Sequence, residues 1–254
     1  GGQFNGSSGY EEAAAQGLIA GINAARKLQG KEGIVIDRSQ GYIGVLIDDL
    51  VTKESHEPYR MMTSRAENRL LLRQDTADIR LSAIGHEVGL IDDERYARLL
   101  KKEELIAKEI ERVNHVNLGT SEAVQKLLEA YGSTPLTSGT TLAELIRRPE
   151  LSYEKLAPVD NARPELPYDV KEQVDINIKY DGYIKRQMRQ VEQFKKLENK
   201  RIPENIDYDS IQSLRLEAKQ KLNQIRPASI GQASRISGVS PADISVLLVY
   251  LGSK

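Results

Sequence analysis

Arginines at regular intervals are the residues of this sequence whose type and spacing most directly indicate a chemistry. Arg65, Arg69 and Arg73 are four residues apart, and Arg60 precedes them. That interval keeps their side chains near one face of a helix, and it also places them on one side of a strand. Guanidinium groups stay charged and bind phosphates bidentately, so an RNA backbone is a natural ligand. The alternative is that nearby carboxylates neutralise them in internal ion pairs, namely those of Glu67, Asp75 and Asp78.

A loop of small polar residues opens the chain and runs into an alanine-rich stretch that ends at Gly17. Gly6 and Gly9 allow tight turns, and Ser7 or Ser8 can cap the helix that follows. The free amides of the first helical turn can then face a bound group. An ordinary capped helix with no ligand is the alternative.

Two pairs of acidic residues limit which ligands this part of the chain could bind. Glu11 and Glu12 would repel a phosphate placed over the helix start, so a neutral, polar part of a ligand fits better there. Asp48 and Asp49 suggest metal ligation, but adjacent side chains diverge in either regular structure and no third ligand has a clear spacing. We interpret them as a capping or ion-pairing pair, and we predict neither a metal site nor catalytic residues.

The elements that must position these residues are mostly helices. The apolar run 42–51 fits either a strand or a buried helix. Longer periodic patterns predict helices over the ranges 11–28, 92–113, 120–128, 141–146 and 170–197, the last interrupted only at Gly182. Because no heptad persists, short helices joined by proline turns should pack as an irregular bundle.

The last quarter of the chain suggests a protein or nucleic-acid partner. Residues 179–201 carry eight basic against three acidic side chains, which indicates a polyanion or an acidic protein surface, with a solvated helix face as the alternative. Residues 229–244 have the pattern of a helix-turn-helix, with Ser240 and Pro241 opening the second helix. That helix is too apolar to read bases, so we expect it to be buried in a small helical bundle.

Composition agrees with an intracellular, soluble protein. The 254 residues are 29% charged with a formal net charge of -1, and none is cysteine, which excludes disulfides and thiolate zinc sites. His56, His86 and His115 show no ligand spacing and are expected on the surface or in loops. No apolar run approaches the roughly 20 residues of a membrane helix, and no signal peptide opens the chain, so a cytoplasmic location is expected.

Three strings of residues carry a resemblance to a known family: Gln3 to Gly17, Glu57 to Arg73, and Arg226 to Val239. They resemble, in order, segments of the tRNA uridine 5-carboxymethylaminomethyl modification enzymes, also called glucose-inhibited division protein A. The resemblance implies the carboxy-terminal part of a longer flavoprotein. It implies a mostly α fold: the tail of a flavin-binding α/β domain over residues 1–90, an irregular helical domain over 91–203 and a small terminal helical bundle over 204–254.

The resemblance also implies a function. The intact family modifies carbon 5 of the wobble uridine of tRNA with FAD, NADH, a folate one-carbon donor and a GTPase partner, and the enzyme is expected to be a homodimer. Without its flavin-binding beginning, this segment is expected to be inactive. The alternative from another class is a non-catalytic nucleic-acid-binding or scaffold protein with a helix-turn-helix-like end. The sequence upstream of Gly2 would distinguish the two, because the enzyme requires a dinucleotide-binding loop there.

Site residues follow from the same resemblance. Cofactor contact is implied for Gln3, Gly6, Ser7, Ser8 and Gly9. A role in tRNA binding is implied for Arg60, Arg65, Arg69 and Arg73, with Asn68 standing where an aromatic residue is usual. Contact with the GTPase is expected from basic and aromatic side chains thought to be exposed, namely Tyr183, Arg186, Arg189 and Arg235.

Overall fold

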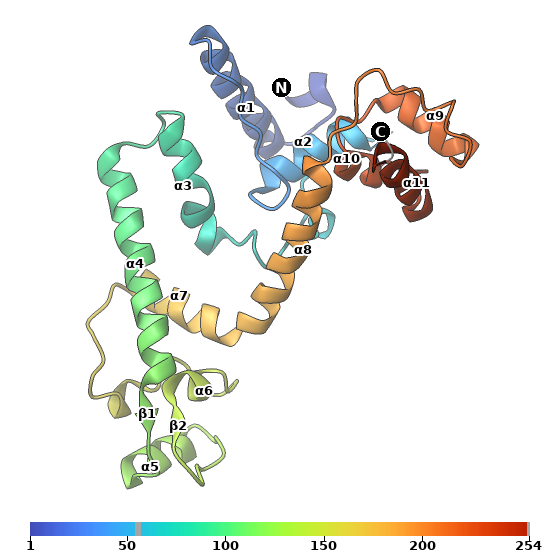
Figure 1. Cartoon of the computed structure of the whole chain (residues 1–254). Helices are drawn as coiled ribbons and strands as arrows, with labels where there is room; N and C mark the ends of the chain where they lie inside the picture. The colour runs from blue at the N-terminus through green and yellow to red at the C-terminus, as the bar shows by residue number, and fades with distance from the viewer. Residues whose placement is uncertain (54–56, 253–254) are drawn as a thin grey trace. The chain divides into compact units, whose positions relative to one another are not determined.

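The computed structural model describes residues 1–53 and 57–252, and it is mostly helical, as predicted (Figure 1). The chain forms two compact units. Residues 1–81 and 187–254 make the first, and residues 82–186 make the second. The predicted domain boundaries near residues 90 and 203 stay predictions.

The first unit begins with a 3-10 turn, Gly2–Asn5, followed by α1, Tyr10–Leu28. Glu11 and Glu12 lie in the first turn of α1 and Arg26 and Lys27 in its last, which suits the helix dipole. The expectation that Ser7 or Ser8 caps this helix is wrong. Gly9 is the N-cap residue and no side chain caps it, because the Ser7 hydroxyl donates instead to the Gly2 carbonyl oxygen.

The apolar run that fitted a strand or a helix is helix α2, Tyr42–Thr52. Its buried side chains include Val45, Leu46, Asp49 and Thr52, the three-to-four-residue spacing of a helix packed on one face. Gly44 lets this helix lie directly against the preceding chain, because a Cβ there would stand 2.3 Å from the Asp37 carbonyl oxygen.

The segment that carries the four arginines is neither a regular helix nor a strand. Between residues 57 and 76 it contains an isolated bridge from Tyr59 to Ser7 and two 3-10 turns, Thr63–Arg65 and Gln74–Thr76. It also contains a turn in which the Leu71 and Leu72 amides donate to the Asn68 carbonyl oxygen. The prediction that the spacing places the arginines on one face is therefore wrong, since it assumes a regular element. Residues 57–75 are called the arginine segment below.

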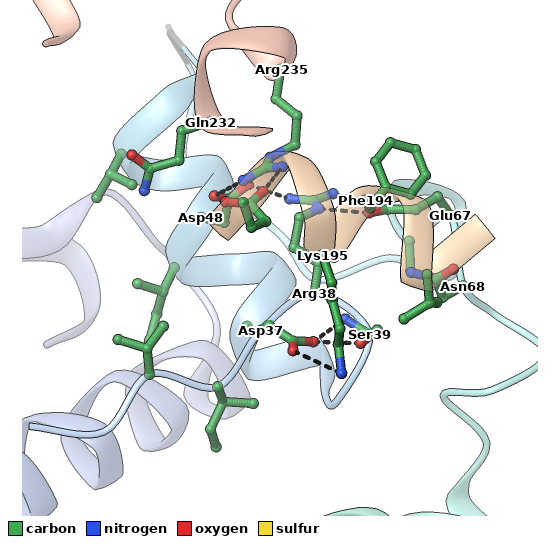
Figure 2. A pocket seen from close by; sticks show the side chains of 18 of the residues that line it. Asp37, Arg38, Ser39, Asp48, Glu67, Asn68, Phe194, Lys195, Gln232 and Arg235 are labelled. Atoms are coloured by element: carbon green, nitrogen blue, oxygen red, sulfur yellow. Dashed lines mark hydrogen bonds and ion pairs between the residues drawn. The ribbon is translucent and has the colours of Figure 1, made fainter. Parts of the chain in front are cut away.

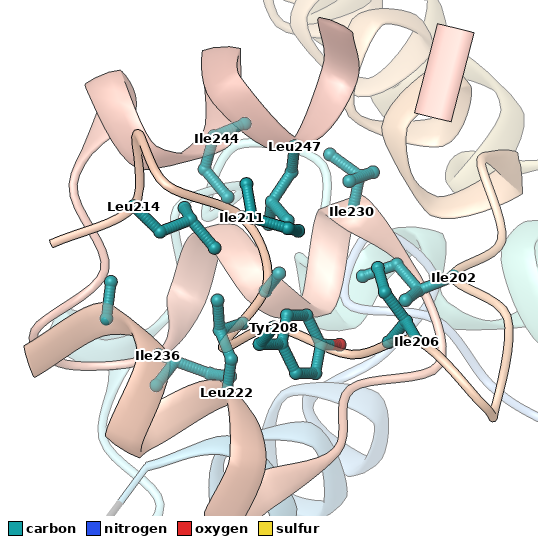
Figure 3. Close-up of a cluster of buried hydrophobic side chains, with 12 residues drawn as sticks. Ile202, Ile206, Tyr208, Ile211, Leu214, Leu222, Ile230, Ile236, Ile244 and Leu247 are labelled. Carbon is teal, nitrogen blue, oxygen red and sulfur yellow. The ribbon is translucent and has the colours of Figure 1, made fainter. Parts of the chain in front are cut away.

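The rest of the first unit includes residues 187–199 of α8, Asp181–Asn199, and a terminal bundle made of residues 202–252. The bundle contains α9, Leu216–Ile225; α10, Ile230–Arg235; and α11, Pro241–Gly252. Its helices enclose Tyr208, Leu222, Ile230 and Leu247, all fully buried (Figure 3). Ser240 opens α11 as predicted, because its hydroxyl accepts a hydrogen bond from the Asp243 amide.

The second unit is built around α4, Asp93–His115, which Asp92 caps by accepting from the Arg95 amide. It also contains α5, Glu122–Ala130; α6, Leu142–Ile146; and α7, Tyr168–Lys179. Strands β1, Asn117–Leu118, and β2, Thr140–Thr141, pair antiparallel. Helix α3, Ala77–Glu87, begins in the first unit and ends in the second.

The predicted single helix over 170–197 is two helices. Tyr180 ends α7 with φ of -104° and ψ of 11°, and α8 begins at Asp181. The break falls at Tyr180 and not at Gly182, which lies inside α8.

Within residues 1–53 and 57–252, no helix is long and apolar enough to cross a membrane, and no three acidic or imidazole groups gather as metal ligands. His86 stacks on Tyr96, with 4.4 Å between the ring centres. Nδ1 of His115 lies 2.8 Å from the Glu111 carbonyl oxygen. His56 lies outside the described residues.

Candidate functional site

Gln16 of α1 holds the loop at the start of the chain in a defined shape. Its Oε1 accepts from the Gly2 amide at 2.7 Å, and its Nε2 donates to the Asn5 carbonyl oxygen at 3.1 Å. Gln16 is itself buried. The loop Gly2–Gly9, called the cofactor loop below, is therefore supported by hydrogen bonds from within this chain. The sequence analysis did not identify Gln16, although a glutamine among alanines on one helix face indicates a polar side chain that needs hydrogen-bond partners.

The structure divides the predicted cofactor residues by exposure. Gln3, Gly6 and Ser8 are exposed, whereas Ser7 and Gly9 are buried. Gly6 has φ of 74°, a conformation that favours glycine. Gln3, Gly6 and Ser8 can reach a ligand, while Ser7 and Gly9 form the base of the loop.

The arginine segment lies against this loop. The Tyr59 amide donates to the Gly6 carbonyl oxygen at 2.7 Å, and the Met61 amide donates to Oε1 of Glu12 at 2.7 Å. That bond from Met61 lowers the pKa of the buried Glu12, against the effect of burial, so its carboxylate is charged. A Cβ on Gly9 would meet Glu12 Oε2 at 1.7 Å and Arg60 Nη1 at 3.1 Å. The fold thus brings Arg60 next to the predicted cofactor residues.

The four arginines do not form one surface. Arg60 and Arg69 are exposed. Arg65 stacks its guanidinium over the Tyr59 ring at 4.4 Å, and Arg73 forms a forked pair with Asp75, with Nε–Oδ1 and Nη2–Oδ2 distances both 2.9 Å. The alternative, that nearby carboxylates neutralise these arginines, is therefore correct for Arg73 and Asp75. Glu67 pairs with an arginine outside this set.

That arginine is Arg38, which the sequence analysis missed. Its buried side chain lies 2.9 Å from Asp48, 2.5 Å from Asp49 and 2.8 Å from Glu67. Asp49 also accepts from the Tyr59 hydroxyl at 2.8 Å. Burial alone would raise the pKa of Asp49, but hydrogen bonds from Lys53 and Arg38 outweigh it and lower that pKa. The ion-pairing interpretation of Asp48 and Asp49 is confirmed.

A cavity of about 1150 Å³ lies within the first unit, between α1 and α2 on one side and α8 and α10 on the other. Figure 2 shows Arg38 between Asp48 and Glu67 on its wall, with Phe194 and Lys195 of α8 and Gln232 and Arg235 of α10 around it. Arg69 also lines the cavity. Isoleucine and valine residues form much of its apolar lining: Ile19, Ile34, Val35, Ile36, Ile47, Val51 and Val191.

The predicted partner residues fall into two groups. Tyr183 is 67% exposed, and Arg186 and Arg189 are exposed on the same helix, α8. The expectation that Arg235 is exposed is wrong. Its side chain is only 16% exposed, and it forms ion pairs with Asp48 and Glu198.

The helix-turn-helix pattern corresponds to α10 and α11, but α11 serves the core. Ile244 and Leu247 of α11 are buried in the terminal bundle with Ala233 and Ile236. A recognition helix must instead present polar side chains to a groove. This burial disfavours the alternative of a DNA-reading end.

Comparisons with known proteins agree with this architecture. The family "tRNA modifying enzyme MnmG/GidA C-terminal helical domain" matches residues 93–188, and "tRNA modifying enzyme MnmG/GidA C-terminal helical bundle" matches residues 190–254. "Glucose inhibited division protein A" matches residues 1–32.

Individual relatives cover nearly the whole chain. The tRNA uridine 5-carboxymethylaminomethyl modification enzyme MnmG of Lachnoclostridium phytofermentans is 71% identical over 99% of the chain, and that of Caldicellulosiruptor saccharolyticus is 65% identical over 98%. The chain spans 40% of the length of each.

A solved structure gives the same result. Aquifex aeolicus GidA in its form II crystal superposes with a TM-score of 0.85 at 42% identity, covering 99% of this chain and 39% of that one. The resemblance carried by the three strings is confirmed, and the chain belongs to the MnmG/GidA family of tRNA-modifying enzymes.

Proposed function

We propose that this chain supplies tRNA-binding and partner-binding surfaces to a flavin-dependent enzyme that modifies carbon 5 of the wobble uridine of tRNA. For the intact enzyme the proposal includes FAD, with NADH and a folate one-carbon donor as co-substrates. It also includes a GTPase partner, a homodimeric assembly and a cytoplasmic location. The names of the relatives support the tRNA substrate.

The observation that carries the proposal is the contact between the cofactor loop and the arginine segment. The Tyr59 amide donates to the Gly6 carbonyl oxygen, and the Met61 amide donates to Glu12. Arg60 lies between Tyr59 and Met61 in the chain, so these two bonds hold it beside the loop. An enzyme that modifies a base of a polyanion requires phosphate-binding groups beside its redox cofactor. Arg60 meets that requirement, and Arg69 adds a second exposed cation on the same segment.

The cofactor loop fits the proposed flavin. The exposed residues of the loop are uncharged. The nearby carboxylate of Glu12 accepts a hydrogen bond from the Met61 amide, and its Oε1 lies 3.8 Å from Arg60 Nε. Gln3, Gly6 and Ser8 would contact a neutral polar edge of FAD, and Ser7 and Gly9 would hold the loop. When bound, the flavin supplies the redox chemistry, and these residues orient it.

The proposed GTPase surface is the exposed face of α8. Tyr183, Arg186 and Arg189 recur every three residues, which keeps them on one side of the helix. Tyrosine and arginine are enriched among the residues that dominate protein interfaces. The exposed cations would also accelerate association with an acidic partner at low salt.

The tRNA-binding proposal is tested by removing the two exposed arginines. Arg60→Ala with Arg69→Ala should weaken tRNA binding by the 254-residue chain. The slope of log affinity against log salt should fall by about two, because two phosphate contacts are lost. Arg65 and Arg73 stay unchanged, since their contacts with Tyr59 and Asp75 make them structural as well. Filter binding at several salt concentrations measures both quantities.

The matched control removes two exposed cations from the second unit, Lys101→Ala with Lys126→Ala, whose side chains are 62% and 72% exposed. This variant has the same net charge as the test variant. If both double variants lose affinity equally, binding depends on net charge alone, and the arginine segment is not the tRNA site.

A further inference from the structure

Arg235 occupies a position between three elements of the first unit. It is the last residue of α10, and its Nε and Nη2 each lie 2.7 Å from a carboxylate oxygen of Asp48 on α2. Its Nη1 bonds to Oε1 of Glu198 on α8. Figure 2 shows Arg235 reaching Asp48 in this way. The planar guanidinium group of Arg235 contacts Asp48 with two nitrogens and Glu198 with the third, so it fixes the direction of these contacts as well as their length. The single ammonium group of a lysine cannot do this.

Glu198 is itself held by the start of α10. Its Oε2 accepts from the Ser229 hydroxyl at 2.8 Å, and a Cβ on Gly231 would lie 2.3 Å from its Oε1. The glycine therefore permits the carboxylate to sit against the α10 backbone. Both ends of this short helix are thus bound to one carboxylate of α8, which fixes the terminal bundle at α8 and α2 together.

Asp48 connects Arg235 to the arginine segment through Arg38. Its Oδ2 accepts from Arg38 Nη1 at 2.9 Å. Arg38 then donates to Glu67 through two bonds, Nε–Oε1 of 2.8 Å and Nη2–Oε2 of 2.9 Å, and to the Arg65 carbonyl oxygen at 3.3 Å. The segment between Arg65 and Glu67 has no regular ladder of backbone hydrogen bonds, so these side-chain bonds contribute much of what determines its shape.

We propose that Arg235 is a positioning residue for tRNA binding. Through Asp48 and Arg38, it makes the conformation of the arginine segment depend on the placement of the terminal bundle. The residue contacts no RNA in this scheme. A partner that shifts the bundle would change tRNA affinity through the same three side chains. The inference rests on the proposed role of the arginine segment.

Spatial continuity does not prove coupling, so the test measures coupling directly. Hydrogen exchange of the 254-residue chain is followed by mass spectrometry in Arg235→Ala, Arg235→Lys, Asp48→Asn and the Arg235→Ala, Asp48→Asn pair. Arg235→Ala should accelerate exchange of the Arg65, Leu71 and Leu72 amides, about two- to thirtyfold. The pair should add little beyond Asp48→Asn alone, because Asp48 joins Arg235 to Arg38 and its change already breaks the contact that Arg235→Ala removes.

Arg235→Lys keeps the charge but loses the fork, so it should show an intermediate acceleration, and it serves if Arg235→Ala does not fold. Lys196→Ala is the charge-matched control, since Lys196 is an exposed cation on α8. It should leave the 62–72 amides unchanged. Acceleration confined to residues 229–236 in both Arg235 variants would overturn the proposal, because the effect would then be local.

Filter binding with tRNA separates this inference from the proposed function. If both hold, Arg235→Ala weakens binding while Lys196→Ala has a smaller effect. If exchange at 62–72 accelerates but even the parent chain binds no tRNA, the coupling stands and the tRNA-binding role fails. If the parent binds tRNA and Arg235→Ala binds as tightly, the positioning role fails and the proposed function stands.

Discussion

Two buried tyrosines show how differently one residue type is used in this protein. The Tyr153 hydroxyl donates to Glu109 Oε1 at 2.8 Å, and burial followed by that bond raises its pKa. Tyr208 is fully buried in the terminal bundle, and its hydroxyl has no hydrogen-bond partner among the described residues. An unsatisfied buried hydroxyl costs about 1–3 kcal/mol. Tyr208 therefore stabilises the bundle through its ring and destabilises it through its oxygen.

The expected result of Tyr208→Phe is an unchanged or higher melting temperature, with a gain of up to about 1 kcal/mol in the free energy of unfolding. Tyr153→Phe is the matched change and should cost about 1–3 kcal/mol, because it removes a hydrogen bond to the buried Glu109 carboxylate, which keeps its pair with Arg112. Denaturant unfolding of both variants measures the difference. A clear destabilisation by Tyr208→Phe would show that its hydroxyl has a partner, such as an ordered water.

At the same scale, the sequence allowed only part of the ion-pair network to be predicted. Adjacent Asp48 and Asp49 were interpreted as a capping or ion-pairing pair, and the ion-pairing interpretation is confirmed. Which cations they were did not follow, because Arg235 is far away in the chain and Arg38 lies in a break between elements. Such partners are selected by tertiary packing, and no local spacing marks them.

Among the elements, α2 shows how one glycine determines a packing distance. Gly44 lies under the carbonyl groups of Asp37 and Ile36, which would stand 2.3 and 2.4 Å from a Cβ. Arg38 follows directly in the chain, so the close approach of α2 also places Asp48 and Asp49 within reach of its guanidinium group.

Gly44→Ala should therefore lower the free energy of unfolding by about 1–3 kcal/mol, through overpacking against backbone that cannot rotate away. Gly21→Ala in α1 is the control, because no atom lies within 4 Å of its Cβ position. That change should instead stabilise by about 0.5–1 kcal/mol, as for a helix glycine in open space. If the two variants melt together, the contact at Gly44 is not tight.

The sequence predicted the short helices α5 and α6 as well as the long helix α4, but it left the run 42–51 open and did not show the break at Tyr180. Helix α4 was predicted over residues 92–113, because a sustained apolar period follows Asp92. The run 42–51 stayed open between strand and helix, since ten residues hold too few repeats to separate the two periods. The arginine segment fits both periods and adopts neither; its backbone instead donates to Glu12 and Gly6 and accepts from Arg38.

At the scale of the whole molecule, one buried carboxylate makes the stability of the terminal bundle depend on pH. Asp243 in the terminal bundle is buried and bonds to Arg215 through Oδ2 at 2.7 Å and to the Ser240 amide at 2.8 Å. Burial would raise the pKa of Asp243, but these bonds outweigh it and hold that pKa well below the usual range. A carboxylate with a lowered pKa adds stability above its unfolded value, about 3.9, and that stability is lost as the pH falls toward the folded value.

Asp243→Asn should therefore destabilise the terminal bundle by about 1.5–3 kcal/mol at neutral pH, and the difference from the parent should shrink below about pH 4. Hydrogen exchange resolves where the loss occurs. Amides of α9 to α11 should lose protection, while those of α4 and α7 in the second unit keep it. Equal loss in both units would show that the chain unfolds as one cooperative body.

The first unit is discontinuous in the chain, and this affects how the protein is made. Residues 1–81 complete their unit only with residues 187–254, so the whole of 82–186 is synthesised in between. At about 5–20 residues per second, Asp48 waits on the order of ten to forty seconds after its own synthesis before Arg235 is synthesised. The second unit, contiguous in sequence, can fold during that interval. A nascent chain arrested before residue 235 should therefore bind chaperones through residues 1–81, and that binding should end once residues 187–254 have emerged and completed the first unit.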